Sequence, residues 1–110
     1  MAKEVEAKNC QTQEEIELAI SEIAAACDHF KIGKTGETIQ GRGNQSDYQD
    51  YDFIQSLFES NLNALISTYE KEFIDKFKDH PKNDNDKEGR QSLFDKMTGS
   101  DTYHLYVVWK

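Results

Sequence analysis

The sequence predicts one α+β domain in which a small three-stranded sheet packs against two or more helices. Two stretches, 12–29 and 61–80, place apolar residues at helical spacing, whereas residues 103–109 are rich in aromatic and β-branched residues, as strands are. A few short strands together with two or more helices in one small domain favour an α+β architecture. A chain of 110 residues has the size of one domain. We expect residues 1–11 to be a flexible leader and residues 12–110 to form the domain.

The first predicted helix covers residues 12–29. Its start carries a capping box, because the Thr12 hydroxyl and the Glu15 carboxylate can satisfy backbone amides that lack a partner in the first turn. The apolar stripe that follows has helical spacing and consists of Ile16, Ala19, Ile20, Ile23, Ala24 and Cys27. The polar leader before Thr12 shows no such periodicity.

A short strand is predicted over 29–34, and Gly33 and Gly36 allow a turn that residues with a β-carbon resist. A short helix is expected within 37–45. Residues 51–58 alternate apolar and polar side chains, which indicates a second strand.

The longest predicted helix begins near Asn61, which we expect to be its N-cap, and ends at His80 and Pro81. Its apolar stripe consists of Leu62, Leu65, Ile66, Tyr69, Phe73 and Phe77. A polar loop over 83–89 and a helical turn over 91–97 are expected to follow.

The last strand is predicted over residues 103–109, which are rich in aromatic and β-branched residues. Its two faces are Tyr103, Leu105, Val107 and Trp109 on one side, and His104, Tyr106 and Val108 on the other.

The charge balance weighs against tight binding of nucleic acid. Asp and Glu outnumber Lys and Arg by 21 to 13, which gives a net charge of −8. Proteins that grip a phosphate backbone usually present a basic face, because phosphate contacts supply most non-specific affinity. A local basic patch at Lys31, Lys34 and Arg42 is still compatible with this balance, since many acids lie elsewhere, in 4–22 and 84–88.

Other features exclude several classes of protein. No apolar run approaches the length of a transmembrane helix, and no basic-then-apolar leader is present, so we expect a cytoplasmic protein without a membrane partner. Cys10 and Cys27 lack zinc-ligand or disulfide spacing and are expected to be free thiols. The three histidines show no ligand spacing either, and the acidic stretch 84–88 lacks the glycine and distal glutamate of a calcium loop.

The stretch Lys-Ile-Gly-Lys-Thr-Gly over 31–36 is followed by Arg42 and, on the longest predicted helix, by Glu70. Its spacing is not that of a phosphate-binding P-loop. This order of a glycine turn, an arginine and a helical glutamate resembles the GIY-YIG nuclease superfamily, especially its compact viral and bacterial branch, whose second motif often reads Lys-Ile-Gly. The resemblance implies a GIY-YIG-like fold and a metal-dependent endonuclease activity.

The resemblance also implies roles for single residues. Arg42 would contact the scissile phosphate, and a guanidinium is suited to this because it can hold two phosphate oxygens at once. Glu70 would hold one Mg²⁺ (or Mn²⁺), a hard cation that prefers carboxylate and water oxygens. Lys31 and Lys34 would bind the nucleic-acid backbone beside Arg42.

In the resembled family a strand with a tyrosine that activates water precedes the Lys-Ile-Gly strand, but here a helix occupies that place. We expect the C-terminal strand to replace it, as though by circular permutation, with Tyr106 as the tyrosine and Tyr103 as second choice. Asn85, rather than Asn83, is expected to match the late asparagine that some members carry.

The sequence thus predicts a small metal-dependent nuclease-like protein that cleaves or binds nucleic-acid phosphodiesters. The alternative is a non-enzymatic, acidic interaction protein, such as an inhibitor, an immunity protein or a DNA mimic, that binds a basic protein partner through complementary charge. The nuclease hypothesis predicts that Arg42, Glu70 and a tyrosine converge. The interaction-protein hypothesis predicts acidic residues gathered on one exposed face.

Overall fold

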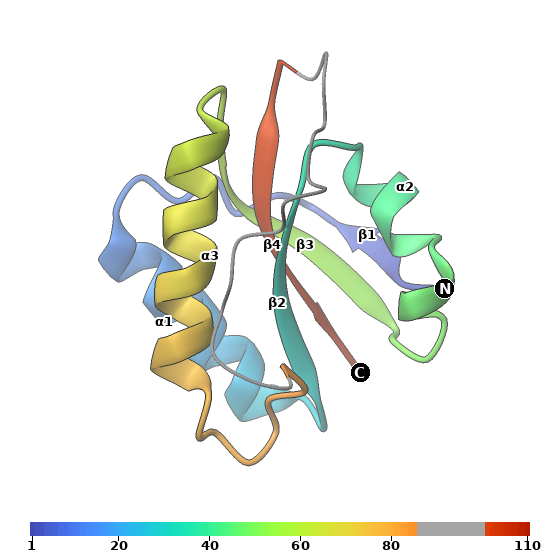
Figure 1. The fold of residues 1–110 in the computed structure, drawn as a ribbon. Helices are drawn as coiled ribbons and strands as arrows, with labels where there is room; N and C mark the ends of the chain where they lie inside the picture. The colour runs from blue at the N-terminus through green and yellow to red at the C-terminus, as the bar shows by residue number, and fades with distance from the viewer. Residues whose placement is uncertain (86–100) are drawn as a thin grey trace.

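The computed structural model describes residues 1–85 and 101–110, and these residues form an α+β fold around one mixed sheet of four strands in the order β1-β3-β4-β2 (Figure 1). The strands are β1 (Lys3–Val5), β2 (Phe30–Thr35), β3 (Phe53–Ser60) and β4 (Tyr103–Trp109). The helices are α1 (Gln13–Ala26), α2 (Ile39–Gly43) and α3 (Asn63–Phe77), with a 3₁₀ turn at Ser46–Tyr48. None of the helices in the described part has the length and apolar character needed to cross a membrane.

The sheet separates two hydrophobic clusters. One face carries Ile32, Leu105 and Val107 and packs against α1 and α3. The opposite face carries Ile54, Tyr106 and Val108 and lies beneath α2 and the 3₁₀ turn. Figure 1 shows α1 and α3 together on one side of the sheet and α2 on the other. The face on which a residue lies therefore decides which helix it can contact.

Strand β4 has the predicted bounds and the predicted division into two faces. It lies between β3 and β2 and pairs with both in antiparallel register. Tyr106 stands opposite Gly33 of β2 in this register. The C-terminal strand is thus the direct neighbour of the Lys-Ile-Gly strand, as the expected permutation requires.

The sheet contains one strand more than predicted. β1 lies within residues 1–11, for which we expected a flexible leader, and it pairs in parallel with β3. Ala2 is fully buried, its amide donates to the Gly43 carbonyl at 3.0 Å, and Cys10 is also buried. A strand of three residues shows no readable alternation, and its partners are distant in sequence, so the composition of the segment did not reveal it.

The predicted helices are present with shorter bounds. The capping box of Thr12 and Glu15 is confirmed, and α1 ends at Ala26. The predicted cap of α3 is wrong, because the N-cap is Leu62, which offers no side-chain acceptor. The expected helical turn over 91–97 lies outside the described residues, as does the end of the polar loop over 83–89.

The outer edge of β2 is covered by the segment that follows α3. The Phe30 amide donates to the Lys82 carbonyl at 2.9 Å, and the Asp84 amide donates to the Phe30 carbonyl at 2.8 Å. One residue further, the Asn85 side chain accepts from the Ile32 amide at 3.0 Å and donates to the Ile32 carbonyl at 3.1 Å. These contacts satisfy backbone groups that an edge strand otherwise leaves to solvent.

Candidate functional site

Arg42 and Tyr106, both predicted site residues, meet on the face of the sheet beneath α2. The Arg42 Nε donates a hydrogen bond to the Tyr106 hydroxyl at 2.9 Å, and an Nη of Arg42 donates to the Gln45 side-chain oxygen. The Tyr106 hydroxyl also lies 2.5 Å from the Tyr48 hydroxyl. Helix α2, strand β4 and the 3₁₀ turn thus each contribute one side chain to a single contact.

Gly33 makes room for this cluster. A β-carbon on Gly33 would lie 2.5 Å from Cζ of Tyr106 and would also meet its hydroxyl oxygen, which is closer than real β-carbons approach other atoms. The Tyr106 ring can therefore lie across β2 only because position 33 is glycine. The glycine that carries the motif resemblance has a local structural reason here, since it fixes where Tyr106 presents its hydroxyl.

The Arg42 side chain is half-buried and stays protonated. Burial alone lowers its pKa, but the nearby oxygens of Tyr106 and Tyr48 raise that pKa by more, so the net shift is upward. Burial raises the pKa of Tyr106 well above its ordinary value, and Tyr48 adds to the rise, whereas Arg42 opposes it. Tyr106 is fully buried, so it is a neutral phenol at neutral pH.

No carboxylate among the described residues forms an ion pair with Arg42. Its hydrogen-bond acceptors are the phenol oxygen of Tyr106 and the amide oxygen of Gln45, which are both neutral. An indirect link to an acid exists, because the Gln45 side chain donates to Glu37 at 2.7 Å. Within residues 1–85 and 101–110, the contacts of Arg42 thus hold its positive charge in place without neutralising it.

The two predicted backbone-binding lysines lie on different faces. The Lys31 Nζ is 5.8 Å from the centre of the Tyr48 ring, on the side of Arg42, whose guanidinium carbon is 5.3 Å from the same ring. The Lys34 Nζ instead donates to Asn63, at 3.4 Å, and to Ser67, both on α3. The structure therefore brings Lys31 to Arg42 and directs Lys34 toward the other side of the sheet.

Glu70, the predicted metal ligand, is a half-buried residue of α3. That helix packs on the face formed by Ile32, Leu105 and Val107, whereas Arg42 and Tyr106 meet on the opposite face. Within residues 1–85 and 101–110, no three His, Cys, Asp or Glu side chains gather as a group that could hold a metal ion. The described side chains thus do not assemble a centre in which a Glu70-bound Mg²⁺ and Arg42 share one face.

Two other polar clusters flank the tyrosines. The Asp84 carboxylate accepts from the Tyr51 hydroxyl at 2.6 Å and lies 3.1 Å from Nδ1 of His29. At the opposite end of β4, Nδ1 of His104 lies 2.9 Å from the Ser56 hydroxyl. The pKa of the His104 imidazole is lowered, mainly because the side chain is partly buried.

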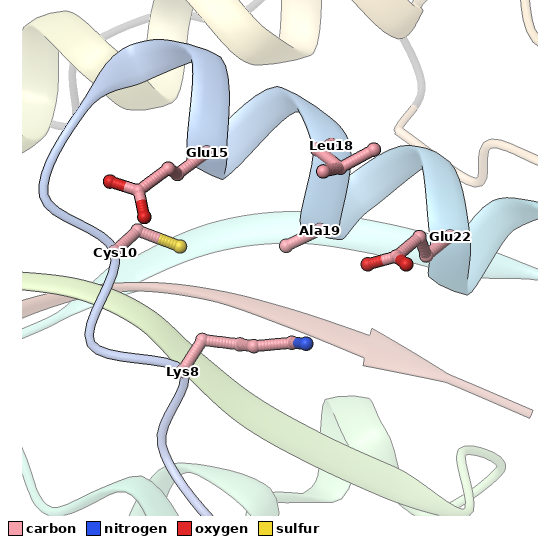
Figure 2. Close-up of a pocket in the computed structure, with 6 residues that line it drawn as sticks. All are labelled: Lys8, Cys10, Glu15, Leu18, Ala19 and Glu22. Carbon is pink, nitrogen blue, oxygen red and sulfur yellow. The ribbon is translucent and has the colours of Figure 1, made fainter.

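A separate cavity of about 160 Å³ opens between α1 and the segment before it, on the side of the sheet away from Arg42 (Figure 2). It is lined by Lys8, Cys10, Glu15, Leu18, Ala19 and Glu22. Burial raises the pKa of the Cys10 thiol, and the nearby Glu15 raises it further. The thiol is therefore protonated and weakly nucleophilic.

Sequence reasoning missed Tyr48 and Gln45, which complete the contact around Arg42. Both lie in a polar stretch between a short helix and a strand, where no apolar periodicity marks a buried side chain. The only signal of burial in this stretch is the spacing of Tyr48 and Tyr51, because residues three apart in a tight turn can share one face. In the structure their rings pack edge to face with their centres 5.8 Å apart.

Comparison with known proteins yields no match for this chain, whether to a family model, a curated protein or a solved structure.

Proposed function

We propose that this protein binds the phosphodiester backbone of nucleic acid and that Arg42 contacts a phosphate. The observation that carries the proposal is a half-buried guanidinium held by neutral oxygens, with no described carboxylate paired to it. Removing a cation from water costs free energy unless an anion compensates it. A phosphate suits this position because its oxygens match the planar fork of N–H donors on arginine.

The surroundings of Arg42 support a GIY-YIG-like arrangement as part of this proposal. Tyr106 faces Gly33 across neighbouring strands, and Asn85 contacts the backbone of Ile32 beside that glycine. The role of Tyr106 in the proposal is to position Arg42. A fully buried, neutral hydroxyl already engaged by Arg42 and Tyr48 is poorly placed to take a proton from water.

Metal-dependent cleavage, with Mg²⁺ or Mn²⁺ at Glu70, stays a separate prediction from the resemblance. Helix α3, which carries Glu70, and helix α2, which carries Arg42, cover opposite faces of the sheet. Binding requires only the residues around Arg42, whereas metal-dependent cleavage also requires Glu70. A single experiment can therefore separate the two.

The test is fluorescence anisotropy with short labelled oligonucleotides, single-stranded and duplex, of DNA and of RNA, at low salt. Arg42→Gln should weaken binding by about 10- to 100-fold, since charge-assisted hydrogen bonds contribute roughly 1.5–3 kcal/mol. Arg42→Lys should fall between the wild type and Arg42→Gln, because it keeps the charge but loses the two-pronged geometry. Thermal unfolding of each variant controls for folding.

The same samples are then incubated with Mg²⁺ or Mn²⁺ to measure cleavage. Glu70→Gln is compared with Glu72→Gln, which changes an exposed carboxylate on the same helix. Cleavage that depends on Glu70 and not on Glu72 would support the metal role. No binding by the wild type, or equal binding by Arg42→Gln, would overturn the proposed function and favour the alternative, an acidic protein that binds a basic protein partner.

A further inference from the structure

We propose that the phosphate backbone of the bound nucleic acid follows a row of three cations, Arg42, Lys31 and Lys110. In this proposal the Lys110 side chain contacts a phosphate at one end of the row. This inference rests on the proposed function and extends it from one phosphate to a path. It starts from the three tyrosines beneath these cations, which the sequence did not group.

The ring of Tyr48 contacts those of both Tyr106 and Tyr51, so the three rings are linked by two contacts. The centre of the Tyr48 ring lies 5.9 Å from that of Tyr106 and 5.8 Å from that of Tyr51, and both pairs pack edge to face. Each ring has a cation near it: Arg42 lies 5.9 Å from the centre of Tyr106, and Lys110 lies 5.6 Å from that of Tyr51.

The middle ring, that of Tyr48, is shared by two cations. The Lys31 Nζ and the Arg42 guanidinium carbon lie 5.8 Å and 5.3 Å from its centre. A cation is attracted to the face of an aromatic ring, so the tyrosines hold these side chains in place without cancelling their charge. All three cations thus lie beside one set of linked rings.

The three cations have no described carboxylate as an ion-pair partner, although acids outnumber bases in the chain. Lysines of α3 behave differently: Lys71 pairs with Asp75 at 2.9 Å, and Lys76 pairs with Glu17 at 2.6 Å. In a protein with a net charge of −8, cations gathered without carboxylates indicate a place where an external anion supplies the negative charge.

Backbone hydrogen bonds fix the position from which the Lys110 side chain extends. Its carbonyl accepts from the Asp28 amide at 2.7 Å, and its amide donates to the His29 carbonyl at 3.0 Å. Asp84, an acid at this end of the row, is engaged by the Tyr51 hydroxyl and by His29 and forms no ion pair with Lys110.

Burial of the rings determines the kind of recognition. Tyr106, Tyr48 and Tyr51 are 0%, 2% and 9% exposed, so they cannot stack on nucleic-acid bases. Only the cations reach the ligand, and contacts to phosphate carry no sequence information. We expect oligonucleotides of different sequence and equal length to bind with affinities within about twofold of one another.

The experiment measures how the binding constant of a labelled oligonucleotide depends on salt. Removing one cation that binds a phosphate should reduce the slope of log K against log salt by about 0.7 for a single strand and about 0.9 for a duplex. Lys31→Gln and Lys110→Gln should each produce this reduction, whereas Lys31→Arg and Lys110→Arg should keep the wild-type slope. The control is Lys8→Gln, an equal change of charge at the cavity on the opposite side of the sheet (Figure 2).

Reduced slopes for both glutamine variants, with Lys8→Gln unchanged, would support the row. Unchanged slopes, a reduction at only one of the two lysines, or an equal reduction in Lys8→Gln would overturn it. In each of these cases a loss of binding in Arg42→Gln would leave the proposed function intact. Failure of the wild-type protein to bind any oligonucleotide would overturn both.

Discussion

Replacing Gly33 by alanine tests the packing on which the Arg42 site depends. The new β-carbon would lie 2.5 Å from Cζ of Tyr106, and the buried ring would have to move. Forcing extra volume into a packed core costs roughly 1–3 kcal/mol. Displacing the Tyr106 hydroxyl from Arg42 and Tyr48 adds roughly 1 kcal/mol for each hydrogen bond that breaks. Removing a glycine from a strand returns about 0.5–1 kcal/mol, so the net cost is about 3 kcal/mol.

Urea unfolding followed by circular dichroism measures this cost. With a slope of about 2 kcal/mol per molar, the midpoint should fall by about 1.5 M. The control is Gly41→Ala, whose β-carbon would meet the Thr38 hydroxyl at 2.8 Å. That hydroxyl caps α2 by accepting from the Gly41 amide, and losing the cap costs about 1 kcal/mol, which the better helix propensity of alanine offsets, so stability should change by less than about 1 kcal/mol. In a Tyr106→Leu background, Gly33→Ala should lose most of its cost, because the ring it meets is absent. A neutral or stabilising effect of Gly33→Ala in the wild-type background would refute the reasoning.

Three further predictions concern stability, each measured by urea unfolding. Asn85→Ala should cost about 1–3 kcal/mol, because it leaves the Ile32 amide and carbonyl of β2 without their side-chain partners; an unchanged midpoint would contradict this contact. Thr12→Ala should cost about 1 kcal/mol through loss of the cap of α1, whereas Thr68→Ala is the exposed control on α3. The pKa of His104 is lower in the folded protein than in the unfolded chain. Its contribution to the free energy of unfolding should therefore be fully present above the unfolded pKa of about 6.5 and be lost as pH falls through the folded pKa. His104→Gln should flatten this pH dependence, and an equally steep loss in the variant would assign it to other groups.

The elements that the sequence predicted well are those with local signals. β4 is rich in aromatic and β-branched residues, and both its bounds and its two faces are as expected. The capping box of α1 depends on residues within one turn, so it too could be read directly. The resemblance led us to expect the C-terminal strand beside the Lys-Ile-Gly strand, and β4 does pair with β2, with Tyr106 opposite Gly33.

The remaining features depend on contacts between distant residues. β1 is defined by its pairing with β3, and nothing in three residues distinguishes it from a polar leader. The face of the sheet that Glu70 approaches was not readable, because the edge of an amphipathic stripe does not say which neighbour lies beyond it. Tyr48 was missed for a similar reason, since its burial is imposed by Tyr106, which lies 58 residues later.

The most direct test of the central claim is to observe the Arg42 Nε–H group by NMR while phosphodiester is added. The hydrogen bond to Tyr106 should protect this proton from exchange with water, so that it gives a distinct signal in the free protein and loses it in Tyr106→Phe. The account predicts that an oligonucleotide shifts this signal in a saturable manner at low salt and that added salt reverses the shift. A protected Arg42 signal that stays unmoved while the oligonucleotide binds elsewhere, or does not bind at all, would contradict it.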